Sequence, residues 1–139
     1  MSTDANNALV QGYFAVLNDG LVDIVDKDFF TDDYRLHLNS GAEINRATAV
    51  GMLRAFMEAF PGIFHSIEDQ FAVGDRVVTR IVVRGVHQRQ FGKLAATNKE
   101  VAFNSIYIHR IVGDRIAEHW IVSDQQGMLR QLGVIPAAG

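Results

Sequence analysis

The spacing of hydrophobic residues changes from helical to strand-like about halfway along the chain. Leu9, Tyr13, Val16 and Leu17 share one face of a predicted first helix, which we expect to end at Asn18-Asp19-Gly20. The same kind of pattern predicts a helix over residues 21–29, a strand over 34–38 and a helix over 46–60. The first half of the chain is therefore expected to be mainly helical.

The second half alternates between hydrophobic and polar residues and is rich in valine and isoleucine, as strands are. A two-residue turn at Gly113-Asp114 joins the last two strands into a hairpin. Helices followed by an antiparallel sheet indicate an α+β fold, with a ligand cavity between the helices and the concave face of the sheet. The predicted elements of this half are strands over 65–73, 76–89, 100–112 and 115–122 and a last short helix over 125–132.

Composition excludes several classes of protein. The 139 residues are 48% hydrophobic with a net charge of −3, so we expect one domain over residues 1–139 and no nucleic-acid partner. No apolar run reaches the roughly 18 residues of a membrane span, and no signal peptide is recognisable, so a cytoplasmic location is the simplest expectation. Without cysteine or closely spaced histidines, we expect neither a metal nor a cofactor.

The predicted closing hairpin concentrates groups that could carry chemistry. In a regular two-residue hairpin, Tyr107 lies opposite Trp120 and His109 opposite Glu118, all on one face. That arrangement would orient an imidazole with a carboxylate and stack aromatic rings on a planar ligand. An exposed cross-strand pair, or an aromatic pair in a dimer interface, is an equally good interpretation of the pattern.

The register of this hairpin decides which histidine is useful. A single β-bulge would bring His119 and Ile121 to the same face in place of their neighbours. His37, between two leucines of a short strand, either reaches the cavity or is structural. His65 and His87 are expected to be surface residues at strand ends.

Two further features have both a structural and a functional interpretation. Asp124 is a general base if burial raises its pKa, but its position also suits the N-cap of the last helix. Phe56, Met57 and Phe60 form the hydrophobic stripe of the 46–60 helix and would also roof the cavity.

Several short stretches, in order along nearly the whole chain, carry a resemblance to a known family. They are Ala59-Phe60-Pro61-Gly62, Gly74-Asp75-Arg76-Val77-Val78, Arg84-Gly85-Val86-His87, His109-Arg110-Ile111, Ile116-Ala117-Glu118-His119-Trp120 and Asp124-Gln125-Gln126-Gly127-Met128-Leu129-Arg130-Gln131-Leu132-Gly133. With the order of predicted elements, they resemble the SnoaL-like polyketide cyclase family of the nuclear-transport-factor-2-like superfamily. The resemblance implies a cone-shaped curved antiparallel sheet wrapped around N-terminal helices, a cystatin-like α+β fold.

The resemblance also implies a chemistry. The family's cyclases close a ring by intramolecular aldol condensation, without a cofactor, and a carboxylate on the last strand moves the proton. That aspartate position holds Ile121 here, and a family histidine on the preceding strand is matched by Tyr107. The remaining candidates for a catalytic group are therefore His109, His119 and Asp124.

The expected function is a cyclase or isomerase-type enzyme that uses acid–base chemistry on a planar, mostly apolar organic ligand. Alternatives are a non-catalytic ligand-binding protein and, with Asp124, Glu118 and Arg110 around one water, an epoxide hydrolase. We expect a homodimer formed through the outer face of the sheet. The predicted pocket residues are Tyr13, His37, Phe56, Met57, Phe60, Phe103, Tyr107, Trp120 and Ile121.

Overall fold

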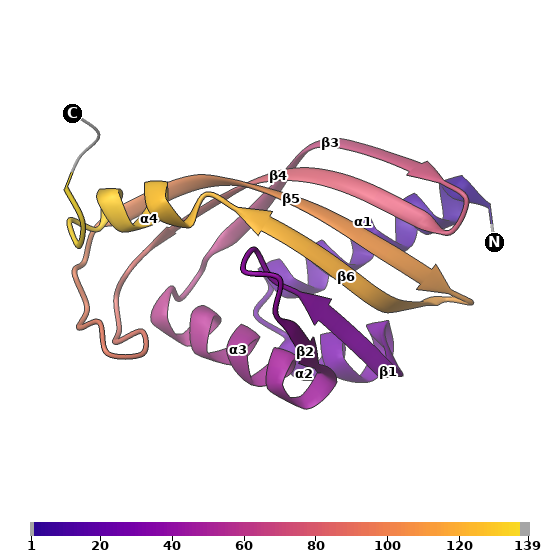
Figure 1. Cartoon of the computed structure of the whole chain (residues 1–139), viewed down its shortest axis with the longest axis horizontal. Coiled ribbons are helices and arrows are strands. Elements are labelled where there is room, and N and C mark those ends of the chain that lie inside the picture. Colours follow the sequence, from indigo (N-terminus) through magenta and orange to yellow (C-terminus); the bar gives the residue numbers. More distant parts are fainter. Residues whose placement is uncertain (1, 137–139) are drawn as a thin grey trace.

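The computed structural model describes residues 2–136 and has the predicted α+β architecture, with helices packed on a curved six-stranded sheet (Figure 1). The strands lie in the order β2-β1-β6-β5-β4-β3. In chain order the elements are α1 (Thr3–Asn18), α2 (Val22–Ile24), the π-helical turn η1 (Val25–Phe29), β1 (Phe30–His37), β2 (Glu43–Asn45), α3 (Arg46–Ala59), β3 (Phe64–Val73), β4 (Arg76–Val86), β5 (Glu100–Val112), β6 (Arg115–Ser123) and α4 (Gln125–Gln131).

The sheet is mixed, whereas the sequence predicted an antiparallel one. Strands β3 to β6 pair antiparallel in chain order, as expected, but β1 joins the edge of β6 in parallel. The alternation of polar and hydrophobic residues within a strand does not indicate which distant strand it pairs with. The three-residue strand β2, antiparallel to β1, is too short to show a period and was not predicted.

Helices α1 and α3 cover the same face of the sheet. The ring of Phe14 in α1 packs 5.3 Å from that of Tyr107, and Phe56 in α3 lies 6.5 Å from Phe103. Tyr107 and Phe103 are four residues apart on β5, so both point to one side of the strand. This interior face carries the hydrophobic core, in which Val10, Phe14, Leu17, Phe60 and Ile81 are fully buried.

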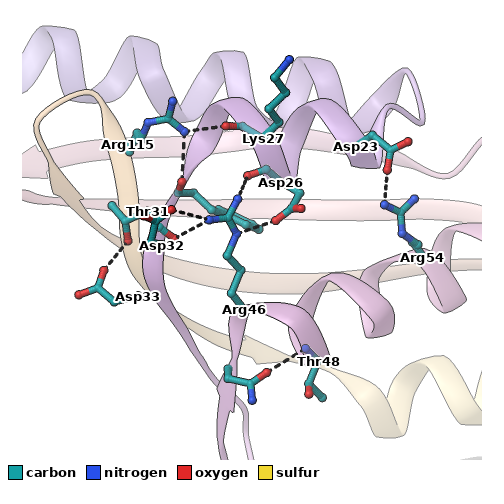
Figure 2. Close-up of polar contacts among 12 residues, drawn as sticks. Asp23, Asp26, Lys27, Thr31, Asp32, Asp33, Arg46, Thr48, Arg54 and Arg115 are labelled. Carbon is teal, nitrogen blue, oxygen red and sulfur yellow. Dashed lines mark hydrogen bonds and ion pairs between the residues drawn. The ribbon is translucent and has the colours of Figure 1, made fainter.

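The predicted 21–29 helix is one α-turn followed by the π-helical turn η1, held by two arginines (Figure 2). A π-turn leaves backbone carbonyls without helical partners. Arg46 donates to the Asp26 carbonyl at 2.6 Å and to its carboxylate at 2.7 Å. Arg115 donates to the carbonyls of Lys27 and Phe30 at 2.7 and 3.2 Å. These guanidinium groups fix the entry into β1 and so the position of that strand beside β6.

Side-chain caps set where the longer helices begin. The Ser2 hydroxyl accepts a hydrogen bond from the Ala5 N–H at the start of α1, and the Asn45 side chain accepts one from Thr48 at the start of α3. Such caps contribute about 1 kcal/mol each to stability. Among residues 2–136, no helix is long and apolar enough to cross a membrane.

Candidate functional site

A β-bulge in β6 sets the register of the closing hairpin. Val112 pairs with Arg115 next to the turn, as a regular hairpin requires, but further along Arg110 pairs with Glu118. Ala117 is the extra residue, and it is buried together with its neighbour Ile116. The regular-hairpin register was therefore wrong, and the bulged alternative is the one that forms.

The bulge places two imidazoles side by side on the interior face. His109 pairs directly with His119, and the centroids of their rings are 4.5 Å apart. The ring of Tyr107 stacks on that of His119 at 4.9 Å, and the edge of Tyr13 meets His109 at 5.3 Å. Both histidines are buried, His109 completely. Three residues named as candidates from the sequence, Tyr13, Tyr107 and His119, thus converge on a fourth, His109.

Most polar atoms of this pair have no partner. The Tyr34 hydroxyl lies 2.7 Å from Nδ1 of His119. Nε2 of His119 and both ring nitrogens of His109 are buried, and nothing in residues 2–136 makes a hydrogen bond to them. An unpaired buried polar atom costs about 1–3 kcal/mol, so three on neighbouring rings are a marked departure from ordinary packing. Such groups in a protein interior are candidates for ligand contact.

Burial keeps the whole cluster uncharged at neutral pH. It lowers the pKa of His109 to about 3. It also lowers the pKa of His119 well below its ordinary value, with smaller contributions from the imidazoles of His109 and His37. Burial raises the phenol pKa values of Tyr34 and Tyr107, so both stay protonated. The cluster therefore offers neutral donors and acceptors without a fixed charge.

The positions tied by resemblance to the cyclase aspartate and histidine are cross-strand neighbours. Ile121 pairs with Tyr107, and both face the interior, where Ile121 is half-buried. In the next row, the hydroxyl oxygens of Ser105 and Ser123 lie 2.6 Å apart. The imidazole pair thus lies one row further along the strands from the position where the family keeps its acid.

Two predicted pocket residues lie on the opposite, outer face of the sheet. The imidazole of His37 stacks on Trp120 at 4.9 Å and donates to the Glu118 carboxylate at 2.6 Å. Arg110 donates to the other oxygen of that carboxylate at 2.9 Å, and the Arg76 guanidinium lies over the Trp120 ring. Placing His37 and Trp120 in the pocket was therefore wrong. The bulge turns Trp120 outward, and strand alternation does the same to His37 beside buried Leu36.

The three groups considered for an epoxide hydrolase do not converge on one site. Arg110 and Glu118 pair on the outer face, where hydrogen bonds outweigh the effect of burial and hold the pKa of Glu118 below its ordinary value. The Asp124 carboxylate accepts a hydrogen bond from the Gly127 N–H at 2.9 Å. The interpretation of Asp124 as the N-cap of α4 is confirmed, and the geometry gives no support to epoxide hydrolysis.

His65 and His87 are buried, so their assignment to the surface was wrong. The Asn18 side chain binds both the backbone and the ring of His65, at 2.7 and 2.9 Å, and burial lowers the pKa of His65 to about 4. His65 and Ile67 are two residues apart on one strand and so lie on the same face, which indicated that His65 points inward. His87 lies where β4 leaves the sheet and contacts Thr97 across the following loop, which no local pattern predicts.

The predicted cavity between α3 and the sheet does not coincide with the two best-defined hollows among residues 2–136. One hollow of about 580 Å³ lies between α2 and α3 and takes in Met57, and another of about 440 Å³ lies beside Arg46. However, Phe56 of α3, Leu38 after β1 and Ile121 of β6 are only half-buried where they pack against the core. The apolar face under α3 is thus open at its edge, and a ligand cavity there stays a prediction.

Within residues 2–136, no group of three or more His, Asp or Glu side chains is arranged so that it could hold a metal ion. The candidate site therefore consists of the imidazole pair His109 and His119, the phenols around it, and the apolar surface that extends under α3 through Phe103, Phe56 and Phe60.

Comparison with solved structures supports both the fold and the family. AclR from Streptomyces galilaeus, a proposed hydroxylase, matches with a TM-score of 0.91 and 25% identity over 99% of this chain and 87% of its own. IdmH from Streptomyces antibioticus, a proposed polyketide cyclase, matches with a TM-score of 0.81 and 27% identity over 93% and 99%. A SnoaL-like protein from Jannaschia sp. CCS1, 18% identical with a TM-score of 0.86 over 96% and 95%, shares the fold.

No curated protein matches the chain. The model of one family does, and it covers residues 7–132, from the second turn of α1 to the residue after α4. The match includes every strand and both faces of the hairpin. The chain therefore belongs to the SnoaL-like polyketide cyclase family.

Proposed function

We propose that the protein binds a planar, mostly apolar molecule of the polyketide type between α3 and the interior face of the sheet. We further propose that it catalyses a cofactor-free ring closure or isomerisation there. The observation that carries the proposal is the buried pair His109 and His119, with three ring nitrogens that have no partner in residues 2–136. The family and the proposed roles of AclR and IdmH agree with a small-molecule substrate of this class.

The chemistry needs one acceptor and one donor, and two neutral imidazoles supply both. His109, whose ring nitrogens have no partner within residues 2–136, takes the proton from the carbon next to a substrate carbonyl, leaving an enolate. The Tyr107 phenol and the His119 imidazole, held by Tyr34, donate hydrogen bonds to the developing oxyanion. The new imidazolium returns its proton to the alkoxide or to a different carbon, so no net charge remains.

The low pKa of His109 is compatible with this role. A free imidazolium in this site would be strongly acidic, because burial penalises its charge. An enolate formed beside it is an opposite charge, which raises the pKa of the imidazole only while the intermediate exists. Proton transfer is thus coupled to substrate, and solvent protons are not taken up.

The test is exchange of a substrate proton with solvent. A planar aryl β-ketoester in D₂O should exchange its methylene protons faster with the protein than without it, as measured by NMR. His109→Gln should lower the catalysed rate by about 10²–10⁴, the usual contribution of a general base, with little loss of folding. Asp124→Asn is the matched control and should keep the full rate, because Asp124 caps α4. Dialysis against EDTA should not change the rate.

A non-catalytic ligand-binding role is the second candidate, and Ile121 favours it. An alkyl side chain at the family's acid position cannot move a proton, and the imidazoles are enclosed by aromatic rings. If the ester binds but exchanges no faster than in buffer, the protein is a binding member of the family. Equal exchange by wild type, His109→Gln and His119→Gln would also remove the catalytic assignment.

The partner proposed for the outer face is a second copy of the chain. Five apolar side chains on this face or at its edge are exposed, and Ile106 and Val122 are cross-strand neighbours. Exposed apolar side chains gathered on one face of a sheet are typical of an interface. The set is Phe71, Val73, Ile106, Val112 and Val122. Light scattering should give a dimer for wild type and a monomer for Ile106→Glu/Val122→Glu; a wild-type monomer contradicts the proposal.

A further inference from the structure

Four phenylalanine rings from three elements pack together at the end of the sheet near α4. The ring of Phe56 lies 4.9 Å from Phe60, 5.6 Å from Phe91 and 6.5 Å from Phe103. Phe91 belongs to the β4–β5 loop and also meets Phe60 at 6.1 Å. We call these four residues the phenylalanine cluster. It contains no polar group of its own, but one polar side chain, His87, adjoins it.

His87 fastens the two ends of the β4–β5 loop. Its backbone N–H donates to the Lys99 carbonyl at 3.0 Å, and its carbonyl accepts from the Asn98 N–H at 2.8 Å. Its ring is fully buried and stacks on Phe60 at 5.1 Å. The side chain therefore lies between the loop and the phenylalanine cluster.

The hydrogen bonds of His87 define which nitrogen carries its proton. Nδ1 accepts a hydrogen bond from the Thr97 N–H at 3.2 Å, and the Thr97 hydroxyl lies 3.0 Å from the same atom. A nitrogen that accepts a backbone N–H has no hydrogen, so a neutral ring carries its proton on Nε2. This Nε2–H is buried, and no partner for it exists in residues 2–136.

The unpaired Nε2–H of His87, next to the phenylalanine cluster, does not stabilise the fold. Of the two ring nitrogens, only Nδ1 bonds to the loop. A carbon in place of Nε2 would remove the free-energy penalty of an unpaired buried N–H. The ring adds an unpaired donor next to a cluster of apolar rings, and small-molecule sites use such isolated polar groups to fix the orientation of a ligand. What the site lacks is an acceptor, and a carbonyl oxygen on a planar ring is the group that fits both its shape and its chemistry.

We propose that His87 Nε2–H donates a hydrogen bond to a ring carbonyl of the ligand and so selects quinone-like or aryl ketone molecules over hydrocarbons of the same shape. This inference rests on the proposed function, since it assumes a planar ligand under α3. Phe91, half-buried on the loop, is the ring that the ligand displaces. His87 orients the ligand and takes no part in proton transfer.

The geometry suits an elongated ligand. Phe103 and Tyr107 lie on one face of β5, four residues and therefore about 13 Å apart. A molecule of three or four fused rings, held at one end among the phenylalanine rings, extends its other end toward Tyr107 and the imidazole pair. Orientation by His87 would then decide which carbon meets His109.

Two soluble probes of equal shape test the inference: anthraquinone-2-sulfonate, which has ring carbonyls, and anthracene-2-sulfonate, which has none. Wild-type protein should bind the quinone more tightly in a fluorescence or calorimetric titration. In His87→Asn the amide oxygen takes the place of Nδ1 and keeps the loop anchored, but no donor remains at the place of Nε2. This variant should lose roughly 10-fold in quinone affinity and keep anthracene affinity within about twofold.

His87→Gln is the matched control, because its amide nitrogen takes the place of Nε2 while the acceptor at Nδ1 is lost. It should retain more of the preference for the quinone than His87→Asn, even if the loop is less stable. Equal losses for both probes in His87→Asn would mean that the ring acts only through packing, which overturns the inference and leaves the ligand site in place. If wild type binds neither probe, the ligand site and the inference both fail.

Nitrogen-15 NMR of the wild-type ring keeps the inference testable should His87→Asn fail to fold. The free protein should show the Nε2–H tautomer of His87. Adding the quinone should shift the Nε2–H resonance, whereas adding the anthracene should leave it nearly unchanged. A proton on Nδ1, or equal shifts with both probes, contradicts the proposed donor.

Discussion

The two faces of the β5–β6 hairpin use the same residue types in opposite ways. On the outer face, Glu118 accepts hydrogen bonds from His37 and Arg110, and these side chains are partly exposed. On the interior face, His109 and His119 are buried, and three of their four ring nitrogens have no partner in residues 2–136. The polar groups of the outer cluster are paired with one another, whereas those of the interior cluster need a bound ligand to complete their hydrogen bonds.

One inserted residue produces this difference. Without the bulge at Ala117, Glu118 would lie opposite His109 and form the carboxylate–imidazole pair that the regular hairpin predicted. With it, the charge stays at the solvent side and the interior keeps only neutral groups. A histidine that is close to a carboxylate in the sequence is therefore not necessarily paired with it in the fold. The unpaired histidines are the better functional candidates.

Insertion of one alanine after Ala117 should have the largest effect, because with the bulge kept it moves Glu118 opposite His109 and exchanges the two faces beyond the bulge. The Glu118 carboxylate would then enter the interior beside buried aromatic rings, and a buried unpaired charge is strongly unfavourable. We expect a loss of more than about 5 kcal/mol in the free energy of unfolding, which amounts to loss of the fold. Chemical denaturation followed by circular dichroism measures it.

Ala117→Gly is the control for this insertion, since it keeps the residue count and the bulge. It should cost no more than about 1 kcal/mol. An insertion variant as stable as Ala117→Gly would show that the bulge does not set the two faces apart.

Acid should destabilise the protein through its interior histidines. His65, His109 and His119 all have folded-state pKa values below that of the unfolded chain, near 6.5, so only the unfolded state gains their protons. Stability is complete above about pH 6.5 and falls as the pH drops toward about 4 for His65 and about 3 for His109. At pH 5.5 His65 and His109 each cost about 1.4 kcal/mol, about 3 kcal/mol together, and His119 changes stability in the same direction.

Denaturant titrations at pH 7.5 and 5.5 measure this loss. His109→Gln removes one of the three groups and should reduce the difference between the two pH values by about 1.4 kcal/mol. A difference that does not change in His109→Gln would mean that this ring takes up a proton in the folded protein as readily as in the unfolded chain.

Removing one hydrogen bond on each face should give unequal losses. Tyr34→Phe leaves the buried Nδ1 of His119 without a partner and should cost about 1–3 kcal/mol. Arg110→Gln on the outer face removes one contact of the partly exposed Glu118, which should cost under about 1 kcal/mol. Thermal melts of both variants compare the losses; equal values would contradict the distinction between the faces.

Substitutions at Asp124 should have the smallest effect. Asp124→Ala should cost about 1 kcal/mol through loss of the cap of α4, and Asp124→Asn close to nothing, since asparagine caps equally well. Proton exchange on the β-ketoester should be the same in both variants. A large loss of exchange rate in Asp124→Asn, with an unchanged melting temperature, would make this carboxylate a catalytic group.

Sequence patterns were sufficient for the elements but not for the contacts between distant parts. Periodicity predicted α1, α3 and the strands β3 to β6 because each spans several repeats of its own pattern. It could not predict β2, because three residues are too few to show the alternation of a strand. Nor could it predict the parallel pairing of β1, which depends on Arg46 and Arg115 holding η1. Residues 20 or more apart in the chain determine that arrangement.

The candidate site was predicted only in part, for a physical reason of the same kind. The pair His109 and His119 was among the candidates, yet its assembly required knowing that Ala117 bulges, and either register turns apolar side chains of the last strand inward, Trp120 and Val122 in one and Ile121 in the other. Burial of His65 and His87 depends on Asn18 and Thr97, whose side chains meet them across turns or loops. Hydrogen-bond partners of this kind are absent from local patterns.

Histidine-ring NMR with the planar aryl β-ketoester tests the central claim most directly, because it reports both faces in one spectrum. We predict that His109 is neutral from pH 8 to pH 5, that His119 is neutral at neutral pH, and that the resonances of both rings shift when the ester binds. We also predict that the His37 resonances, on the outer face, do not respond to the ester. Shifts confined to His37, or an interior pair that takes up protons near pH 6.5, would contradict this claim.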